Sequence, residues 1–173
     1  MAASPLPKLC ISAWVAALLP ITVVADTFKE SIELVCHLSA PARVISGKSV
    51  PLTFALANRG KITVNVLKVN TPLEGFYGKY LRVIGPHGEL EYNGAMVKRA
   101  APTREDYLSI KPGATRSKTL DLTTAYDLKL PGKYELTFNG RLLDVTLGQI
   151  PRSFTEPLDV DCPSVRFEIS AAR

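Results

Sequence analysis

Hydrophobic and polar residues alternate along most of the chain after residue 30. In Val50–Ala57, the residues Leu52, Phe54 and Leu56 alternate with small or polar neighbours, and Tyr134, Leu136 and Phe138 do the same in Tyr134–Phe138. A period of two is typical of a β-strand with one buried face. Longer strands are predicted on this ground at Ser31–Leu38, Val50–Ala57, Ile62–Val69, Arg116–Leu122 and Tyr134–Phe138.

Turn signals rich in Gly, Pro and Asn separate these runs at short intervals. Asn58–Lys61 lies between two alternating runs and predicts a hairpin that joins Val50–Ala57 to Ile62–Val69. Pro102–Asp106 and Thr123–Leu128 each have room for one helical turn. Further short strands are predicted at Tyr80–Ile84, Glu89–Tyr92, Ala95–Lys98, Tyr107–Ile110, Leu142–Leu147 and Val165–Ile169.

Many short strands with closely spaced turns predict an all-β protein with an immunoglobulin-like antiparallel β-sandwich. Tyr134 follows Pro131-Gly132-Lys133 and begins an alternating strand, which predicts a tyrosine corner with its hydroxyl bonded to backbone. Pro112-Gly113 predicts a tight turn that shapes the sandwich. These three residues are expected to serve the fold.

The first 25 residues differ from the rest. Cys10–Val24 is almost wholly apolar, and small residues precede Asp26. This pattern predicts a signal peptide at residues 1–25 and one domain at 26–173. The alternative is an uncleaved N-terminal anchor. Cleavage predicts a secreted or periplasmic protein with no membrane span.

An exported chain with an even number of cysteines favours a disulfide. Cys36 and Cys162 remain after cleavage. Their bond would tie the first strand to a segment near the last strand. The alternative is two separate buried thiols.

The charge pattern argues against nucleic-acid binding. The 173 residues carry 21 Lys and Arg against 16 Asp and Glu, a formal net charge of +5. The cations are scattered, whereas a nucleic-acid surface gathers them in a stripe or patch. A moderate preference for acidic partners is all that this charge supports.

No motif in the sequence predicts catalysis. His37 and His87 are far apart and neither begins a His-Glu-x-x-His helix, which a zinc peptidase requires. A Gly-x-Ser-x-Gly elbow and phosphate-binding or dinucleotide loops are also absent. A calcium site at Asp159 and Asp161 is an alternative, but it needs more oxygen ligands than the sequence places near them. We therefore expect a protein that is not an enzyme and holds no cofactor or metal.

Leu67–Gly113 is the most individual stretch of the chain and predicts a binding surface. It contains the turn-rich loop Asn70–Gly78 and the dibasic pair Lys98-Arg99, which precedes Ala100-Ala101-Pro102. The dibasic pair is either a solvated loop or a contact or cleavage site for a partner specific for basic residues. The residues expected to touch a partner are Glu74, Phe76, Tyr77, Lys98 and Arg99.

Motifs in this region and after it resemble a known family. They are Asn70-Thr71-Pro72-Leu73-Glu74-Gly75, Val97-Lys98-Arg99-Ala100-Ala101-Pro102, Glu105-Asp106-Tyr107 and Ala125-Tyr126-Asp127-Leu128. In this order they are similar to the N-terminal domain that precedes the catalytic domain of peptidyl-Lys metalloendopeptidases, relatives of deuterolysin. The resemblance covers most of residues 31–138. It implies a prodomain-like β-sandwich without the zinc domain that follows in those peptidases.

The resemblance implies binding to, or restraint of, a peptidase, and no peptidase activity. Our first hypothesis is a secreted non-catalytic module that binds a protein partner, namely a lysine-specific zinc metallopeptidase, as an inhibitor or a folding assistant. The alternative is a structural or adhesion module of the cell surface or envelope. In that case the loops Asn70–Gly78 and Arg99–Asp106 are the ligand contacts.

Overall fold

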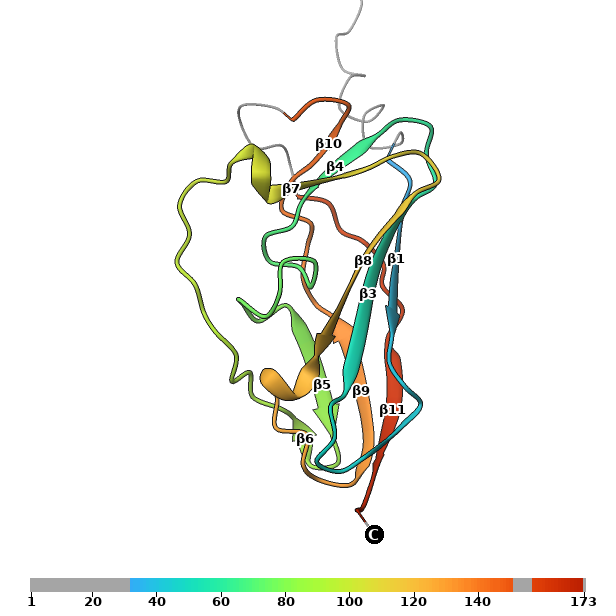
Figure 1. Ribbon diagram of the computed structural model, residues 1–173, viewed down its shortest axis with the longest axis vertical. Helices are drawn as coiled ribbons and strands as arrows, with labels where there is room; N and C mark the ends of the chain where they lie inside the picture. The colour runs from blue at the N-terminus through green and yellow to red at the C-terminus, as the bar shows by residue number, and fades with distance from the viewer. Residues whose placement is uncertain (1–31, 151–156, 173) are drawn as a thin grey trace, which may run out of the picture.

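The computed structural model describes residues 32–150 and 157–172 (Figure 1). The first sheet has the order β1-β3-β8, and the second has the order β2-β11-β9-β5-β6. A third small sheet, in the order β10-β4-β7, lies at the upper end of the molecule in Figure 1. The three sheets confirm the prediction of an all-β sandwich.

The elements have the following bounds. The first sheet contains β1 (Leu34–Ser39), β3 (Pro51–Asn58) and β8 (Thr115–Asp121). The second contains β2 (Arg43–Ile45), β5 (Leu81–Gly85), β6 (Gly88–Glu89), β9 (Gly132–Phe138) and β11 (Val165–Ser170). The third contains β4 (Val64–Leu67), β7 (Tyr107–Ile110) and β10 (Val145–Leu147). Two single 3-10 turns, η1 (Arg104–Asp106) and η2 (Leu122–Thr124), complete the described elements.

The core forms where the inward faces of the first two sheets meet. Leu52, Phe54 and Leu56 of β3 are fully buried, as their alternation predicts. Phe54 packs against Phe138 of β9 with ring centroids 5.2 Å apart. Burying one such side chain stabilises the fold by about 1.5–3 kcal/mol. The period-two pattern therefore locates the core correctly on these strands.

The predicted hairpin between Val50–Ala57 and Ile62–Val69 is wrong. β3 pairs with β1 and β8, whereas β4 pairs with β7 and β10. The buried Asn58 redirects the chain, because its amide donates to Ile62 O at 2.8 Å and to Ile110 O at 2.9 Å. These bonds tie the end of β3 to the third sheet.

Three smaller expectations also differ from the structure. Ala95–Lys98 forms no strand, and only Glu89 of the predicted strand Glu89–Tyr92 lies in a strand, namely β6. The pairing of β2 with β11 is parallel, so the sandwich is antiparallel with one exception. Ala95–Lys98 fails as a strand because no described neighbour offers it a ladder.

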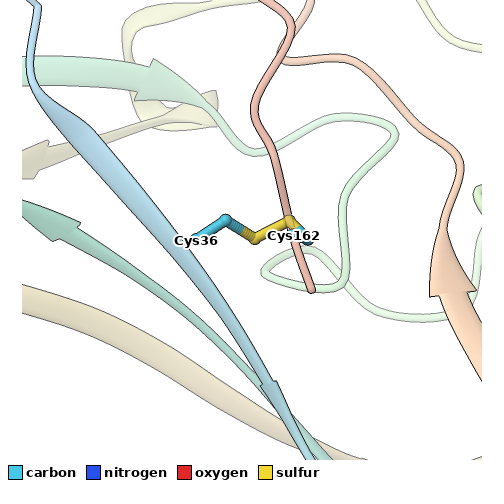
Figure 2. Close-up of a disulfide and its surroundings, with 2 residues drawn as sticks. All are labelled: Cys36 and Cys162. Atoms are coloured by element: carbon cyan, nitrogen blue, oxygen red, sulfur yellow. A yellow bond between two sulfur atoms is a disulfide. The ribbon is translucent and has the colours of Figure 1, made fainter. Parts of the chain in front are cut away.

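The predicted disulfide is present (Figure 2). Cys36 of β1 and Cys162, which precedes β11, are both buried, and their Cα atoms lie 4.9 Å apart. The bond links the first sheet to the segment that enters the second. It closes a loop with a sequence separation of 126 residues.

Tyr134 and the Lys111–Gly113 turn take the conformations that their sequences predict. The Tyr134 hydroxyl donates to Leu130 O at 2.6 Å, and its ring stacks on Phe167 at 5.3 Å. Burial raises the pKa of Tyr134 above its ordinary value, at which the hydroxyl is already a donor at neutral pH. Gly113 has φ 71°, a conformation that favours glycine, and Ala114 N donates to Lys111 O at 2.9 Å.

The predicted signal peptide, residues 1–25, lies outside the described residues. Among the described residues, no helix is long and apolar enough to cross a membrane.

Loss of the disulfide should lower stability substantially. In the chain-entropy model, a disulfide that closes a loop of this length stabilises the folded state by up to about 5 kcal/mol, and measured values are often lower. We expect the double variant Cys36→Ser, Cys162→Ser to unfold at a clearly lower urea concentration than the parent. Peptide mapping of the unreduced parent should recover one cross-linked fragment containing both cysteines. Recovery of the two cysteines in separate alkylated fragments would contradict the assignment.

Candidate partner-binding surface

A continuous chain of aromatic rings runs from the core to one side of the molecule. Neighbouring ring centroids lie 5.2–6.5 Å apart. Stacked or edge-to-face pairs at such distances contribute about 0.5–1.5 kcal/mol each beyond their buried area. In order, the rings are Phe54, Phe138, Tyr80, Phe76, Tyr126 and Tyr92.

Each tyrosine of this chain also holds a backbone segment through its hydroxyl. Tyr80 donates to Gly75 O at 2.5 Å, and Tyr126 donates to Leu81 O at 2.9 Å. A tyrosine hydroxyl is already protonated at neutral pH, and burial raises the pKa of Tyr80, Tyr126 and Tyr92 further, so all three are hydrogen-bond donors. The aromatic chain therefore fixes both the core and the loops that border it.

The most exposed segment of this side is residues 91–102, which we call the strap. It leaves β6, runs along the outside of the molecule and reaches η1 (Figure 1, yellow-green trace at the left). The strap contains neither strand nor helix, and residues 95–101 are all exposed. Met96 is 75% exposed and Val97 is 48% exposed. Two large apolar side chains thus face solvent next to Lys98.

The first end of the strap is clamped by Tyr92 and Asn93. The Tyr92 ring packs edge-on against Tyr126 at 5.7 Å, and Asn93 N donates to Ala125 O at 2.8 Å. The Tyr92 hydroxyl then donates to Ala95 O at 2.8 Å and closes a small loop around Gly94. A Cβ at Gly94 would lie 2.5 Å from that hydroxyl oxygen, so this close approach requires glycine.

The second clamp is an ion pair between Arg99 and Glu74. The two guanidinium NH groups contact both carboxylate oxygens, with Nη2 donating to Oε2 at 2.6 Å. The Glu74 side chain is only 9% exposed and that of Arg99 is 30% exposed. The guanidinium also lies over the Tyr77 ring, 5.8 Å from its centroid. A shielded, bidentate pair of this kind is stronger than a pair on the open surface.

Residues 70–78 form the loop that presents Glu74, and we call them the clamp loop. Glu74 N donates to Thr71 O at 3.1 Å, and Lys118 Nζ of β8 donates to Glu74 O at 2.6 Å. The buried Thr71 hydroxyl donates in turn to Lys68 O at 2.6 Å. The backbone of Glu74 is therefore held by contacts that do not involve Arg99.

The strap ends on the capped turn η1. Asp106 Oδ2 accepts hydrogen bonds from Thr103 N at 2.9 Å and from Thr103 Oγ1 at 3.1 Å. The hydrogen bond from the Thr103 backbone N–H lowers the pKa of Asp106. The carboxylate, like an ordinary aspartate, is ionised at neutral pH, and it holds Thr103, the residue that follows the strap, in place.

The five predicted contact residues lie together, but they play different parts. Phe76 stacks on Tyr80 at 6.2 Å and meets Tyr126 edge-on at 6.4 Å, so it packs inward against the core. Glu74 and Arg99 bind each other and hold the strap. Only Tyr77, which is 46% exposed, and Lys98, which is also exposed, remain open to a partner.

Met96 and Val97 were not among the predicted contacts, and they lie in Ala95–Lys98, which was predicted to be a strand. Gly94 was the available signal against a strand, since glycine within a short run marks a bend or a close backbone approach. In the described ranges, no three His, Cys, Asp or Glu side chains are grouped to hold an ion.

Comparison with known proteins finds a partial similarity to an extracellular protease. No family model matches the sequence. Over 104 residues the chain is 29% identical to an extracellular protease of Aeromonas hydrophila. The match covers 58% of this chain and 30% of that protease, so it spans less than a third of the relative. Together with the disulfide, this similarity indicates an extracellular location.

Two solved structures of the CARDB domain of the PF1109 protein from Pyrococcus furiosus are weakly similar. The crystal structure, in complex with di-metal ions, has a TM-score of 0.35 and 16% identity, over 82% of this chain and 94% of that chain. The solution NMR structure has a TM-score of 0.32 and 15% identity, over 80% of this chain and 93% of that chain. Similarity at this level carries no argument about function.

Removal of Arg99 tests whether the clamp is strong. Arg99→Ala leaves the shielded Glu74 carboxylate without its partner, so we expect the free energy of unfolding to fall by about 1–3 kcal/mol. Arg43→Ala is the matched control, because Arg43 pairs with Glu168 at 3.2 Å on the open surface. Arg43→Ala should lower the free energy of unfolding by less than about 1 kcal/mol. Equal losses in urea unfolding would show that the clamp is no stronger than an exposed pair.

Proposed function

We propose that this chain contains a non-catalytic extracellular module that binds a peptidase domain, and that the strap and the clamp loop form the contact surface. The single observation that carries the proposal is the strap itself. It is an exposed segment with open apolar side chains, yet both of its ends are fixed by specific contacts. A segment that is exposed and also held in one conformation is suited to recognition, because little ordering entropy is lost on binding.

The similarity to an extracellular protease supports a peptidase as the partner. The motifs that resemble peptidyl-Lys metalloendopeptidases narrow the proposed partner to a zinc peptidase that is specific for lysine. Binding would either inhibit the peptidase or assist its folding. Both roles use the same surface and differ in the state of the peptidase that is bound. The proposal holds whether the peptidase domain is on the same polypeptide or on another.

A binding measurement with matched surface variants tests this proposal. The full chain is immobilised, and a lysine-specific zinc endopeptidase is passed over it in active form and during refolding from urea. We expect saturable binding by the parent and at least tenfold weaker binding by Val97→Asp, because a charge replaces an apolar contact. Ile45→Asp on β2 is the control, since Ile45 is 52% exposed and Val97 is 48% exposed.

Two results would contradict the proposal. One is no binding of the peptidase in either state. The other is an equal loss of affinity in both Asp variants, which would show that the strap is not the contact surface. Binding of envelope components in place of the peptidase would favour the structural or adhesion alternative.

A further inference from the structure

The backbone of the strap is free to pair with another chain. Among the described residues, no backbone–backbone hydrogen bond involves residues 95–102, and Ala95 O is bonded only by the Tyr92 hydroxyl. This segment runs without helix, strand or turn from Ala95 to Ala100. Its N–H and C=O groups are therefore available for the kind of main-chain pairing by which extended peptides are bound.

The two clamps decide which side chains the strap displays. Tyr92 is turned onto Tyr126, and Arg99 is held by Glu74. Between them, Met96, Val97 and Lys98 are exposed. Lys98 forms no ion pair or side-chain hydrogen bond with any described residue. Arg99 is thus held within the module by Glu74, whereas Lys98 is exposed to solvent.

The cleft of an endopeptidase is the kind of site that this arrangement fits. Such a cleft binds its substrate as an extended chain through main-chain hydrogen bonds, and a pocket selects one side chain. A lysine side chain requires a pocket that holds a carboxylate or other acceptors for its ammonium group. The fixed ends of the strap lower the entropic cost of binding in comparison with a free peptide of the same sequence.

We propose that the strap enters the substrate cleft of the partner peptidase as a substrate-like segment, with Lys98 in the pocket that accepts a basic side chain. This inference rests on the proposed function, because it specifies how the peptidase-binding surface is used. It assigns the inhibitory role to Lys98 and a positioning role to Arg99. The module then blocks the active peptidase by occupying the cleft that a substrate needs.

The mode of inhibition tests the inference. The full chain is titrated against a zinc endopeptidase that cleaves at lysine, with a short lysine peptide as the substrate. We expect competitive inhibition, in which the apparent KM rises and kcat is unchanged. Lys98→Met keeps the length of the side chain and removes its charge, so the inhibition constant should rise at least tenfold.

Lys111→Met is the matched control, because Lys111 is also exposed but lies in the turn between β7 and β8. Its inhibition constant should equal that of the parent. Binding of the full chain to the peptidase is measured separately, by sedimentation of the two proteins at the same concentrations. Binding with non-competitive inhibition, or with equal inhibition by Lys98→Met and the parent, would overturn the inference and leave the proposed function standing. Absence of binding by the parent would overturn both.

Discussion

The packing of six aromatic rings is the interaction on which the rest of this structure depends. Phe54 and Phe138 join the two main sheets, and Tyr80, Phe76 and Tyr126 extend the contact beneath the clamp loop. Tyr92 then connects the strap to the same chain of rings. Because each tyrosine also bonds a backbone carbonyl, burial of the rings fixes main-chain segments as well as side chains. The proposed binding surface is therefore an extension of the core.

The ion pair between Arg99 and Glu74 holds the strap in one geometry that only arginine can form. A guanidinium that binds both oxygens of a shielded carboxylate has one favourable geometry, and the adjacent Tyr77 ring restricts it further. Lysine at position 99 could not form the same bidentate contact. The order Lys98-Arg99 thus has physical meaning, since arginine suits the internal clamp and the exposed lysine is the residue that we propose to enter the partner's pocket.

Sequence patterns predict the parts of this fold that depend on local alternation or on residue chemistry. The buried face of β3, the Cys36–Cys162 bond and the Tyr134 hydrogen bond all follow from such patterns. The partners of β4 do not, because both faces of β4 are buried and the turn at Asn58 is decided by bonds to distant carbonyls. Phe76 was expected to face a partner, yet it lies in the aromatic chain, which involves residues far apart in the sequence. The clamp loop and the dibasic pair could be singled out from their motifs, but which of their side chains pack inward and which face solvent could be decided only from the tertiary contacts.

Hydrogen exchange of the full chain, alone and with a lysine-specific zinc endopeptidase, tests the central claim most directly. In the free protein, the amides of residues 95–101 should exchange rapidly, because they are exposed and no described backbone group accepts from them. On binding, these amides should become protected as they pair with the cleft, and the protection should extend to the clamp loop. Protection confined to the edge of β1 or β8, with unchanged exchange in the strap, would contradict the account.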